Sequence, residues 1–436
     1  MAITSREELR RIANPRMLAM LLLGFSSGLP LALSSGTLQA WLAVAKVDIR
    51  AIGLFALVGL PYTLKFLWSP LMDRFVPPRL GRRRGWMLLT QLGLTLALVG
   101  MATGSPHNGL PLLALLALLV AFLSASQDIA VDAYRTDVLP APERGLGAAV
   151  SVAGYRIAML ISGAVALILS DRIGWHNTYL LMAALMGVGM LVSLFGPEPV
   201  TAAAPTSLRA AVVEPFEEFI RRRAGLLILL MIILYKLGDA FAGTLTTAFL
   251  IQDLGFTPTD VGVINKGLGL LATIFGALAG GTLMIRLGLY RALMLFGILQ
   301  AVTNLGFMAL AVVGHSYLGM VLVIGAENLA GGMGTAAFVA LLMALCNHRY
   351  TATQYALLSA LAAIGRVFVG PPAGYIVAAW GWPLFFLGSF VIALPGLVLL
   401  YLLRDTIVPR DRNGDGEAQV GHRPAYPADP EGGAGG

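Results

Sequence analysis

Long apolar segments alternate with short polar ones along most of this chain. Each apolar segment runs for about 20 residues, the length that an α-helix needs to cross the hydrocarbon core of a bilayer. Charged residues collect between these segments, and few fall within them. The pattern therefore predicts an all-α polytopic membrane protein. The predicted spans lie at about 17–42, 51–71, 86–104, 110–134, 146–169, 177–196, 225–250, 261–285, 291–313, 317–345, 352–378 and 384–403.

Composition supports this class and excludes others. Hydrophobic residues make up 57% of the chain and charged residues 12%, which is too apolar for a soluble domain. The net charge of +7 is scattered among the spans and forms no long basic patch, so we expect no nucleic-acid partner. The single cysteine excludes an intramolecular disulfide. The five histidines lack metal-ligand spacing, and we expect no metal, no cofactor and no enzymatic activity.

The longest interior connection divides the spans into two sets of six. It is polar, contains prolines and ends in three arginines. Residues 1–196 are predicted to form an N-terminal six-helix bundle, and residues 225–404 a C-terminal one. Residues 197–224 are predicted to form a cytoplasmic linker. The Gly- and Pro-rich stretch 405–436 is predicted to form a disordered cytoplasmic tail.

The two sets of spans also resemble one another in sequence. "SGTLQAWL" at Ser35 corresponds to "AGTLTTAFL" at Ala242, and "RIGWHNTYL" at Arg172 corresponds to "AAWGWPLFFL" at Ala378. These matches share an offset of about 207 to 209 residues, which chance explains poorly. A duplicated six-span unit predicts the major facilitator fold, twelve helices in two pseudo-symmetric bundles with substrate bound between them.

Arginines predict the orientation of the chain. They precede the first span and fill the loop after the second, the central connection and the end of the last span, whereas the alternate loops are poor in base. Both termini should therefore be cytoplasmic. The loop after the second span resembles the D-R-x-x-x-R-R loop of the major facilitators, which acts as a conformational latch. The resemblance suggests four gating residues: Asp73, Arg74, Arg82 and Arg83. The alternative is that the arginines of this loop only fix the topology.

Charged residues within spans are costly in lipid, and each is a functional candidate. They are Lys65, Asp128, Asp132, Arg156, Lys236, Asp239, Lys266, Glu327 and Arg366. In "SQDIAVDAY", Asp128 and Asp132 share one helix face, since they are four residues apart. Asp128 lies deeper and could carry a transported proton or pair with Arg156 or Lys65. Asp132 lies near the cytoplasmic end, and a coupling role is as open as a solvated one.

The remaining charges leave similar alternatives. Arg156 and Arg366 lie in corresponding spans, and either could hold a substrate carboxylate or an internal acid. Lys236 and Asp239, three residues apart, could simply neutralise one another. Glu327 is the only glutamate deep in a span. A buried carboxyl there could exchange a proton at physiological pH. Glu327 and Asp239 are therefore alternatives to Asp128 as the residue that couples transport to proton movement.

The first predicted span carries many polar side chains. "GFSSGLPLALSSGTLQAW" places hydroxyls, Gly28, the helix-breaking Pro30 and Gln39 within what must be a span. Such hydroxyls often bond only to their own helix. Their density favours a kinked helix that lines a cavity suited to a polyhydroxylated ligand, with Trp41 placed to stack on a sugar ring or to anchor at the interface.

Four stretches together resemble the AmpG family of muropeptide permeases: "GFSSGLPLALSSGTLQAWL", "LKFLWSPLMDR", "SASQDIAVDAYRTD" and "ERGLGAAVSVAGYRIAML". The resemblance is densest over the first five spans. It implies a proton-coupled importer of N-acetylglucosaminyl-anhydromuramyl peptides in a Gram-negative inner membrane, serving peptidoglycan recycling and indirectly β-lactamase induction. The resemblance also implies functional roles for the residues at the matching positions: Gly28, Gln39, Gln127, Asp128, Asp132, Tyr155 and Arg156.

The leading hypothesis is therefore a monomeric muropeptide permease whose partners are its substrate, protons and the lipid bilayer. The substrate's hydroxyl-rich disaccharide suits the first span, and its peptide carboxylates suit Arg156 and Arg366. Lys236 is a further candidate for substrate binding. A carrier of another solute, such as acetyl-coenzyme A, a sugar, a peptide or a drug, is the alternative. A non-transporting sensor is a further one, disfavoured because the chain has no sizeable soluble domain.

Overall fold

The computed structural model describes residues 14–77, 80–107, 109–140, 144–197, 224–345 and 351–407. Side chains of a few residues in these ranges, Asp73 and Arg74 among them, are not described. Most of the predicted linker and of the predicted tail lies outside these ranges. Within them the chain is helical and contains no strand.

The first half of the chain runs from residue 14 to residue 197. Its elements are α2 (Pro15–Ser34), α3 (Gly36–Val44), α4 (Ile49–Leu54), η1 (Phe55–Gly59), α5 (Leu60–Leu64), η2 (Lys65–Leu67), α6 (Ser69–Arg74), α7 (Arg82–Thr103), α8 (Leu110–Val138), α9 (Arg144–Leu160), η4 (Ile161–Val165), α10 (Ala166–Leu185) and α11 (Gly187–Phe195). The segments η1 and η2 are 3₁₀-helical, and η4 is π-helical.

The second half runs from residue 224 to residue 407. Its elements are α13 (Gly225–Thr244), α14 (Thr246–Ala248), η5 (Phe249–Asp253), α15 (Pro258–Asp260), η6 (Val261–Leu268), α16 (Gly269–Leu287), α17 (Leu289–Val313), α18 (Tyr317–Leu345), α19 (Thr351–Phe368), α20 (Gly370–Leu402) and α21 (Arg404–Ile407). Here η5 and η6 are π-helical.

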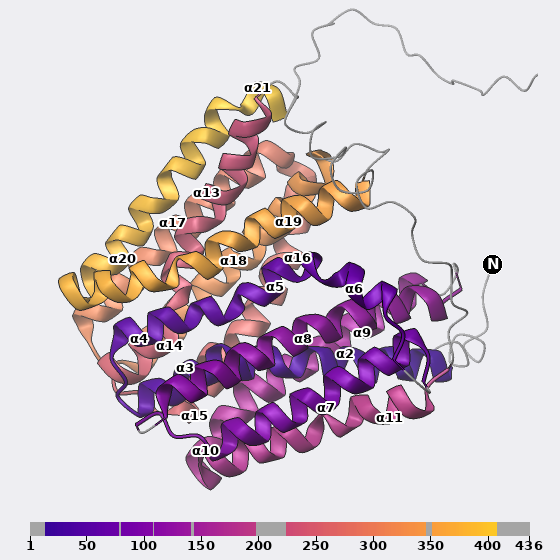
Figure 1. The fold of residues 1–436 in the computed structure, drawn as a ribbon. Helices are drawn as coiled ribbons and strands as arrows, with labels where there is room; N and C mark the ends of the chain where they lie inside the picture. Colours follow the sequence, from indigo (N-terminus) through magenta and orange to yellow (C-terminus); the bar gives the residue numbers. More distant parts are fainter. Residues whose placement is uncertain are drawn as a thin grey trace, which may run out of the picture.

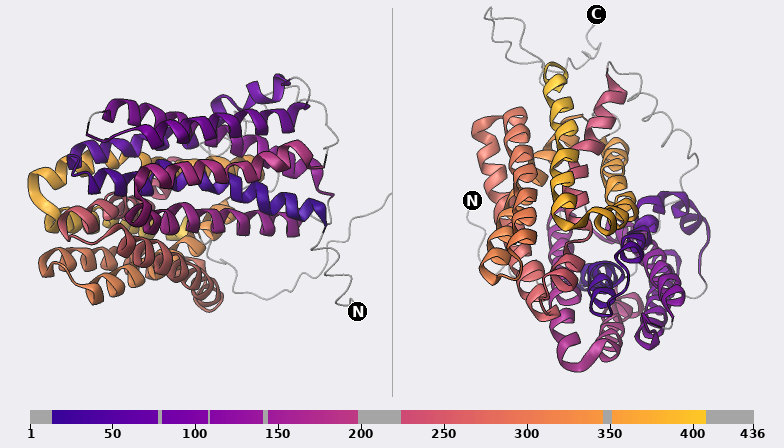
Figure 2. Two further views of the ribbon diagram at one scale, coloured as in Figure 1. Left: turned by 90° about the horizontal axis from the view of Figure 1, so that it is seen from below. Right: turned by 90° about the vertical axis from the view of Figure 1, so that its left-hand side faces the viewer.

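Nine helices of the described ranges are long and apolar enough to cross a bilayer. Two of them, residues 150–195 and 360–402, exceed 40 residues and contain a glycine with positive φ, Gly174 and Gly381. Figure 2 shows the chain reversing direction at both places, in magenta and in yellow. Each therefore supplies two of the predicted spans. The predicted span at 51–71 is divided among the short elements α4, η1, α5, η2 and α6. The first three of these, residues 49–64, together make an apolar helical stretch that is shorter than the nine long helices. The count of twelve spans therefore stays a prediction.

The internal repeat is visible in local structure. Gly174 and Gly381 are 207 residues apart and have φ values of 80° and 75°, and each is followed by a tryptophan. Trp175 stacks on Trp41 with ring centroids 5.7 Å apart, and Trp382 contacts Phe249, the counterpart of Trp41, at 5.0 Å. In each half the tryptophan that follows this glycine therefore packs on an aromatic ring of the first span of that half.

The helix α2 ends at Ser34, four residues after Pro30. Proline cannot donate a backbone hydrogen bond, so the turn around it is weakened. The hydroxyl of Ser34 donates to the carbonyl of Pro30 at 3.0 Å, and that of Ser35 donates to Leu31 at 2.6 Å. The chain resumes as α3 after Ser35, whose backbone is not helical. This confirms the kink expected in the first span.

The two halves pack closely at one end of the molecule. We call the end where α3 ends and α4 begins the distal end, and the end where α2 begins the basal end. At the distal end Gly53 of α4 lies against Gly370 of α20, with no room for a side chain on either. Figure 1 shows the halves meeting near α4 and α20 and spreading apart toward α6 and α21.

Candidate functional site

A cavity of about 480 Å³ lies between the two halves. The first half lines it with α2, α3, the segment 52–63 and α9, and the second half lines it with α13, α14, η6, α16 and α19. Polar groups of the first half in its wall are Ser34, Ser35, Thr37, Gln39, Tyr62 and Thr63. The second half supplies Thr244, Thr247, Lys266 and Arg366.

The charges of this cavity are of one sign. Lys266 and Arg366 line it, whereas no aspartate or glutamate does so among the described residues. Lys266 Nζ donates to Thr247 Oγ1 at 3.3 Å. Arg366 is exposed and makes no hydrogen bond or ion pair within the described ranges. Two cations facing a hydroxyl-lined space suit a polar ligand that carries negative charge.

The polar side chains of the first span divide between two roles. Ser34 and Ser35 bond to their own helix, as the simplest interpretation of such hydroxyls expects. Thr37 instead donates to the carbonyl of Ser162 at 2.6 Å, and Gln39 Nε2 donates to the carbonyl of Thr244 at 2.7 Å. Gln39 thus lines the cavity and also joins the two halves.

Asp128 lies behind the cavity, within the first half. The hydroxyl of Ser27 on α2 donates to its carboxylate, and the Lys65 ammonium acts on it electrostatically. The neighbouring Gln127 donates to Ser26 at 2.9 Å and so repeats the contact with α2 one residue earlier. Neither Asp128 nor Gln127 lines the cavity.

Asp132 is placed apart from Asp128. Its side chain is 55% exposed toward the basal end and pairs with Arg135 at 3.0 Å. Arg156 is likewise exposed, and within the described ranges its one hydrogen-bond contact is a 4.0 Å approach to Met159 Sδ. Among described residues no ion pair joins Asp128 to Arg156 or to Lys65. The structural pairing considered for Asp128 is therefore absent from this conformation, in which Lys65 acts on the carboxylate only electrostatically.

The second half holds its acids differently. Lys236 Nζ and Asp239 Oδ2 lie 3.6 Å apart, and Gln300 donates to the same oxygen at 3.1 Å. Lys236 also donates to Thr335 at 3.3 Å. The neutralising pair considered from the sequence is present, and neither residue lines the central cavity.

Glu327 forms a second polar cluster in the same half. Asn328 Nδ2 donates to its carboxylate at 2.7 Å, and Thr273 of α16 donates to Asn328 Oδ1 at 3.1 Å. Lys236 and Lys266 act on Glu327 electrostatically. Of the glycines near Glu327, Gly332 allows close packing, because a Cβ there would clash with the backbone of Thr273, whereas a Cβ at Gly325 would meet nothing within 4 Å.

Comparison with known proteins identifies the group to which this geometry belongs. The model of the Major Facilitator Superfamily matches residues 17–326 and 228–428. The chain is 55% identical to the anhydromuropeptide permease of Escherichia coli K12, over 92% of this chain and 82% of that protein. It is 37% identical to a Rickettsia conorii protein named AmpG 4, over 89% of this chain and 96% of that one. The chain belongs to the AmpG family of the major facilitators.

A solved structure supports the same fold. A transporter of the POT family in complex with 5-aminolevulinic acid superposes with a TM-score of 0.71 at 11% identity, covering 90% of this chain and 96% of that one. The chain is thus a multi-pass membrane transporter, and the expectation that it is not an enzyme agrees with this membership. Within the described residues, no group of three or more His, Cys, Asp or Glu could hold a metal.

Some residues to which the AmpG resemblance gives a role lie outside the cavity wall. A Cβ at Gly28 would meet the carbonyl of Tyr155 at 2.6 Å, so this glycine allows α2 and α9 to touch. Tyr155 lies beside Asp128 and interacts electrostatically with it and with Arg366. Trp41 is 7% exposed, stacks on Trp175 and contacts the tilted ring of Tyr179, which places it in the core instead of on a ligand.

The predicted gating residues of this AmpG-type chain lie at the basal end. Asp73 and Arg74 have no described side chains. Arg83 pairs with Asp137 of α8 at 2.8 Å, and its neighbour Arg84 donates to the carbonyl of Ser193 at 2.9 Å. These contacts tie α7 to other helices of the same half, and Arg82 begins α7. Their role in gating stays a prediction.

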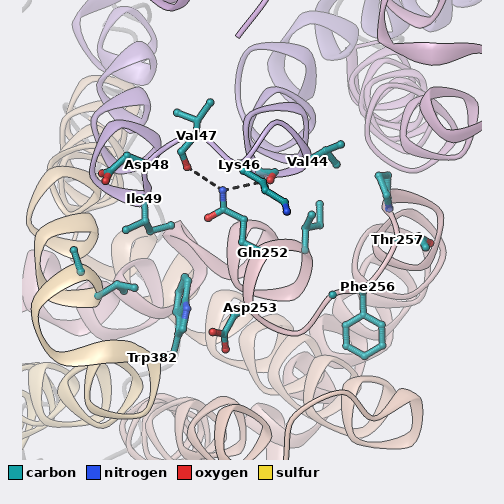
Figure 3. Close-up of a pocket in the computed structure, with 16 residues that line it drawn as sticks. Val44, Lys46, Val47, Asp48, Ile49, Gln252, Asp253, Phe256, Thr257 and Trp382 are labelled. Atoms are coloured by element: carbon teal, nitrogen blue, oxygen red, sulfur yellow. Dashed lines mark hydrogen bonds between the residues drawn. The ribbon is translucent and has the colours of Figure 1, made fainter. Parts of the chain in front are cut away.

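A second pocket of about 680 Å³ lies at the distal end (Figure 3). Gln252 of the second half donates to the carbonyls of Ala43 and Val47 in the first half, at 3.3 and 2.9 Å. At the same end, Thr259 of α15 donates through its backbone to Asp171 of α10 at 2.8 Å. The distal end is therefore closed by hydrogen bonds from both halves, and sequence reasoning missed Gln252.

The sequence indicated Lys266 as a charge within a span but not as a site residue. Its position in the cavity wall depends on the π-helical segment η6, which shifts the helical register locally. Thr244 and Thr247 of the second half repeat the hydroxyls of the first span, and both line the cavity. For Lys266, Thr244 and Thr247, the sequence feature that could have predicted a place in the site is a charged or hydroxyl-bearing side chain within a span.

Proposed function

We propose that this chain is a secondary active importer that carries anhydromuropeptides across the inner membrane by proton symport, for peptidoglycan recycling. The substrate class is the one named for the E. coli relative, which is similar over most of both chains. The observation that carries the proposal is the composition of the central cavity. Hydroxyls and an amide suit the disaccharide and peptide bonds, and Lys266 and Arg366 suit peptide carboxylates.

The orientation of the chain follows from its arginine-rich loops. Arg82, Arg83 and Arg84 lie at the basal end, and such loops remain in the cytoplasm. With the basal end cytoplasmic, the distal end closed by Gln39 and Gln252 faces the periplasm. The structure then corresponds to an inward-facing state in which the cavity is separated from the periplasm.

Transport then proceeds by rocking of one half against the other. In the outward-facing state, the carboxylate of Asp128 accepts a proton from the periplasm, and the muropeptide binds between the halves. Closure of the distal end gives the inward-facing state, from which ligand and proton leave to the cytoplasm. Asp128 is the first candidate for the proton because it contacts the cavity-lining helix α2 through Ser27. Glu327 and Asp239 are the alternatives.

Uptake into proteoliposomes tests the proposal. Purified protein is reconstituted, and accumulation of labelled anhydro-disaccharide tripeptide is followed with and without an inward proton gradient. Accumulation above the external concentration that collapses with a protonophore is expected. Equal uptake with and without the gradient would remove proton coupling. Absence of muropeptide uptake, with competition instead by acetyl-coenzyme A, sugars, peptides or lipophilic cations, would replace the substrate.

A further inference from the structure

Lys266 extends from the second half across the cavity to the surface of the first half. A Cβ added at Gly36 of α3 would lie 3.2 Å from Lys266 Nζ, and one added at Gly163 would lie 3.8 Å from Lys266 Cγ. The first contact is tighter than ordinary van der Waals distance, and the second is ordinary. The absence of a side chain at position 36 therefore leaves room for the ammonium group.

The charge of this ammonium is not neutralised by a neighbour in the structure. Within the described ranges it makes one hydrogen bond, to Thr247, and an ammonium has three donors. Glu327 acts on it electrostatically, but no ion pair joins the two residues among the described side chains. A desolvated cation of this kind is costly unless a ligand or solvent completes its hydrogen bonds.

The two halves contribute different chemistry to the cavity. Both cations, Lys266 and Arg366, come from the second half, and the first half supplies only neutral polar groups there among the described residues. A ligand with a neutral, hydroxyl-rich part and an anionic part would therefore bind in one orientation, with its anionic part toward the second half.

We propose that Lys266 is a specificity-determining residue that binds a carboxylate of the transported ligand, with the neutral glycan part held by the first half. The inference rests on the proposed function for the identity of the ligand. It adds which residue selects the anionic part and which way round the ligand lies. Arg366, on α19, is placed to hold a second carboxylate, because it too lines the cavity without a partner in the described ranges.

A pair of ligands measures this role directly. Binding to purified protein is determined by calorimetry for anhydro-disaccharide tripeptide and for its derivative with the peptide carboxylates converted to carboxamides. The wild-type protein should prefer the acid form by about 10- to 100-fold, as expected for a charged hydrogen bond. In Lys266→Gln this preference should fall to a few-fold, with affinity for the carboxamide form unchanged. Lys266→Arg should keep part of it.

Matched variants keep the test independent of folding. Lys46→Gln removes a lysine from the distal pocket and should leave the preference intact. Gly36→Ala retains Lys266 but crowds its ammonium, and should lower the preference more than Gly163→Ala does. If Lys266→Gln and Gly36→Ala both keep the wild-type preference, Lys266 does not bind the carboxylate. If wild-type protein binds neither form, the proposed substrate is wrong whatever these variants do.

Discussion

The two halves of this AmpG-type chain follow the same helical plan but hold their buried carboxylates in different ways. In the first half, Asp128 accepts a hydrogen bond from the neutral hydroxyl of Ser27. In the second half, Asp239 lies 3.6 Å from the ammonium of Lys236 and also accepts from Gln300. Asp128 thus has a neutral hydrogen-bond partner while Lys65 acts on it only electrostatically, whereas Asp239 has a cation within ion-pair distance.

This difference bears on which acid can carry a proton. A hydroxyl can donate to a carboxylate and can also accept from a protonated carboxyl, so the Ser27 contact can persist when Asp128 changes its charge. Protonation of Asp239 would instead leave Lys236 as a partly buried cation without its counter-charge, which is costly. The comparison favours Asp128 as the coupling residue and Asp239 as part of a structural pair.

The largest effect is expected for Asp128→Asn. The asparagine keeps an oxygen that can accept from Ser27, so the folded state should be retained, but it cannot take up a proton. Accumulation driven by an inward proton gradient should be abolished, and exchange of labelled for unlabelled muropeptide in proteoliposomes should continue. Asp132→Asn is the control, because Asp132 is exposed and bonded to Arg135, and it should still accumulate substrate. Gradient-driven accumulation by Asp128→Asn would move the coupling role to Glu327 or Asp239.

A smaller but clear effect is expected from the ion pair of the second half. Lys236→Ala or Asp239→Ala alone should destabilise the protein by about 3 kcal/mol, because each leaves one partly buried charge without its partner. The double variant should lose less than the sum of the two single losses. Thermal unfolding in detergent, followed by intrinsic fluorescence, measures all three. Additive losses would show that the two side chains act independently, and the contrast between the halves would then fail.

The sequence predicted much of the fold because the features that specify it are local or repeated. Gly174 and Gly381 have the same conformation because each must turn the chain before a tryptophan, and the repeat offset already aligned them. The kink after Pro30 followed from the missing backbone donor. The span at 51–71 was predicted as one helix, but its prolines and glycines divide it into short 3₁₀ and α segments.

The site was predicted less completely because its geometry depends on helix rotation and on contacts distant in sequence. Arg156 and Arg366 occupy corresponding spans, yet only Arg366 lines the cavity. Successive residues project about 100° apart around a helix, so a change of one residue in register decides which side chain faces the ligand. Trp41 was expected at a ligand or an interface, but Trp175, far along the chain, buries it in the core.

The smallest effect is expected where the two halves are most alike, at the closed distal end. Each half contributes one glutamine there that donates to carbonyls of the other half: Gln39 to Thr244, and Gln252 to Ala43 and Val47. Each bond is neutral and worth about 1 kcal/mol, so Gln39→Leu or Gln252→Leu should shift the equilibrium toward distal opening by roughly fivefold. Gln252→Leu should have the larger effect, because Gln252 makes two contacts.

Distances between spin labels on α3 and α15, measured by pulsed electron resonance, report this shift. Asp253→Asn is the matched control, since Asp253 neighbours Gln252 and lines the distal pocket without a side-chain hydrogen bond to any described residue. An increase in the population with long distances is expected for both leucine variants and not for the control. Unchanged distance distributions in both would mean that glycine packing, such as that of Gly53 on Gly370, closes the distal end by itself. A response to Gln252→Leu alone would show that the halves differ at this end too, as they do in their buried charges.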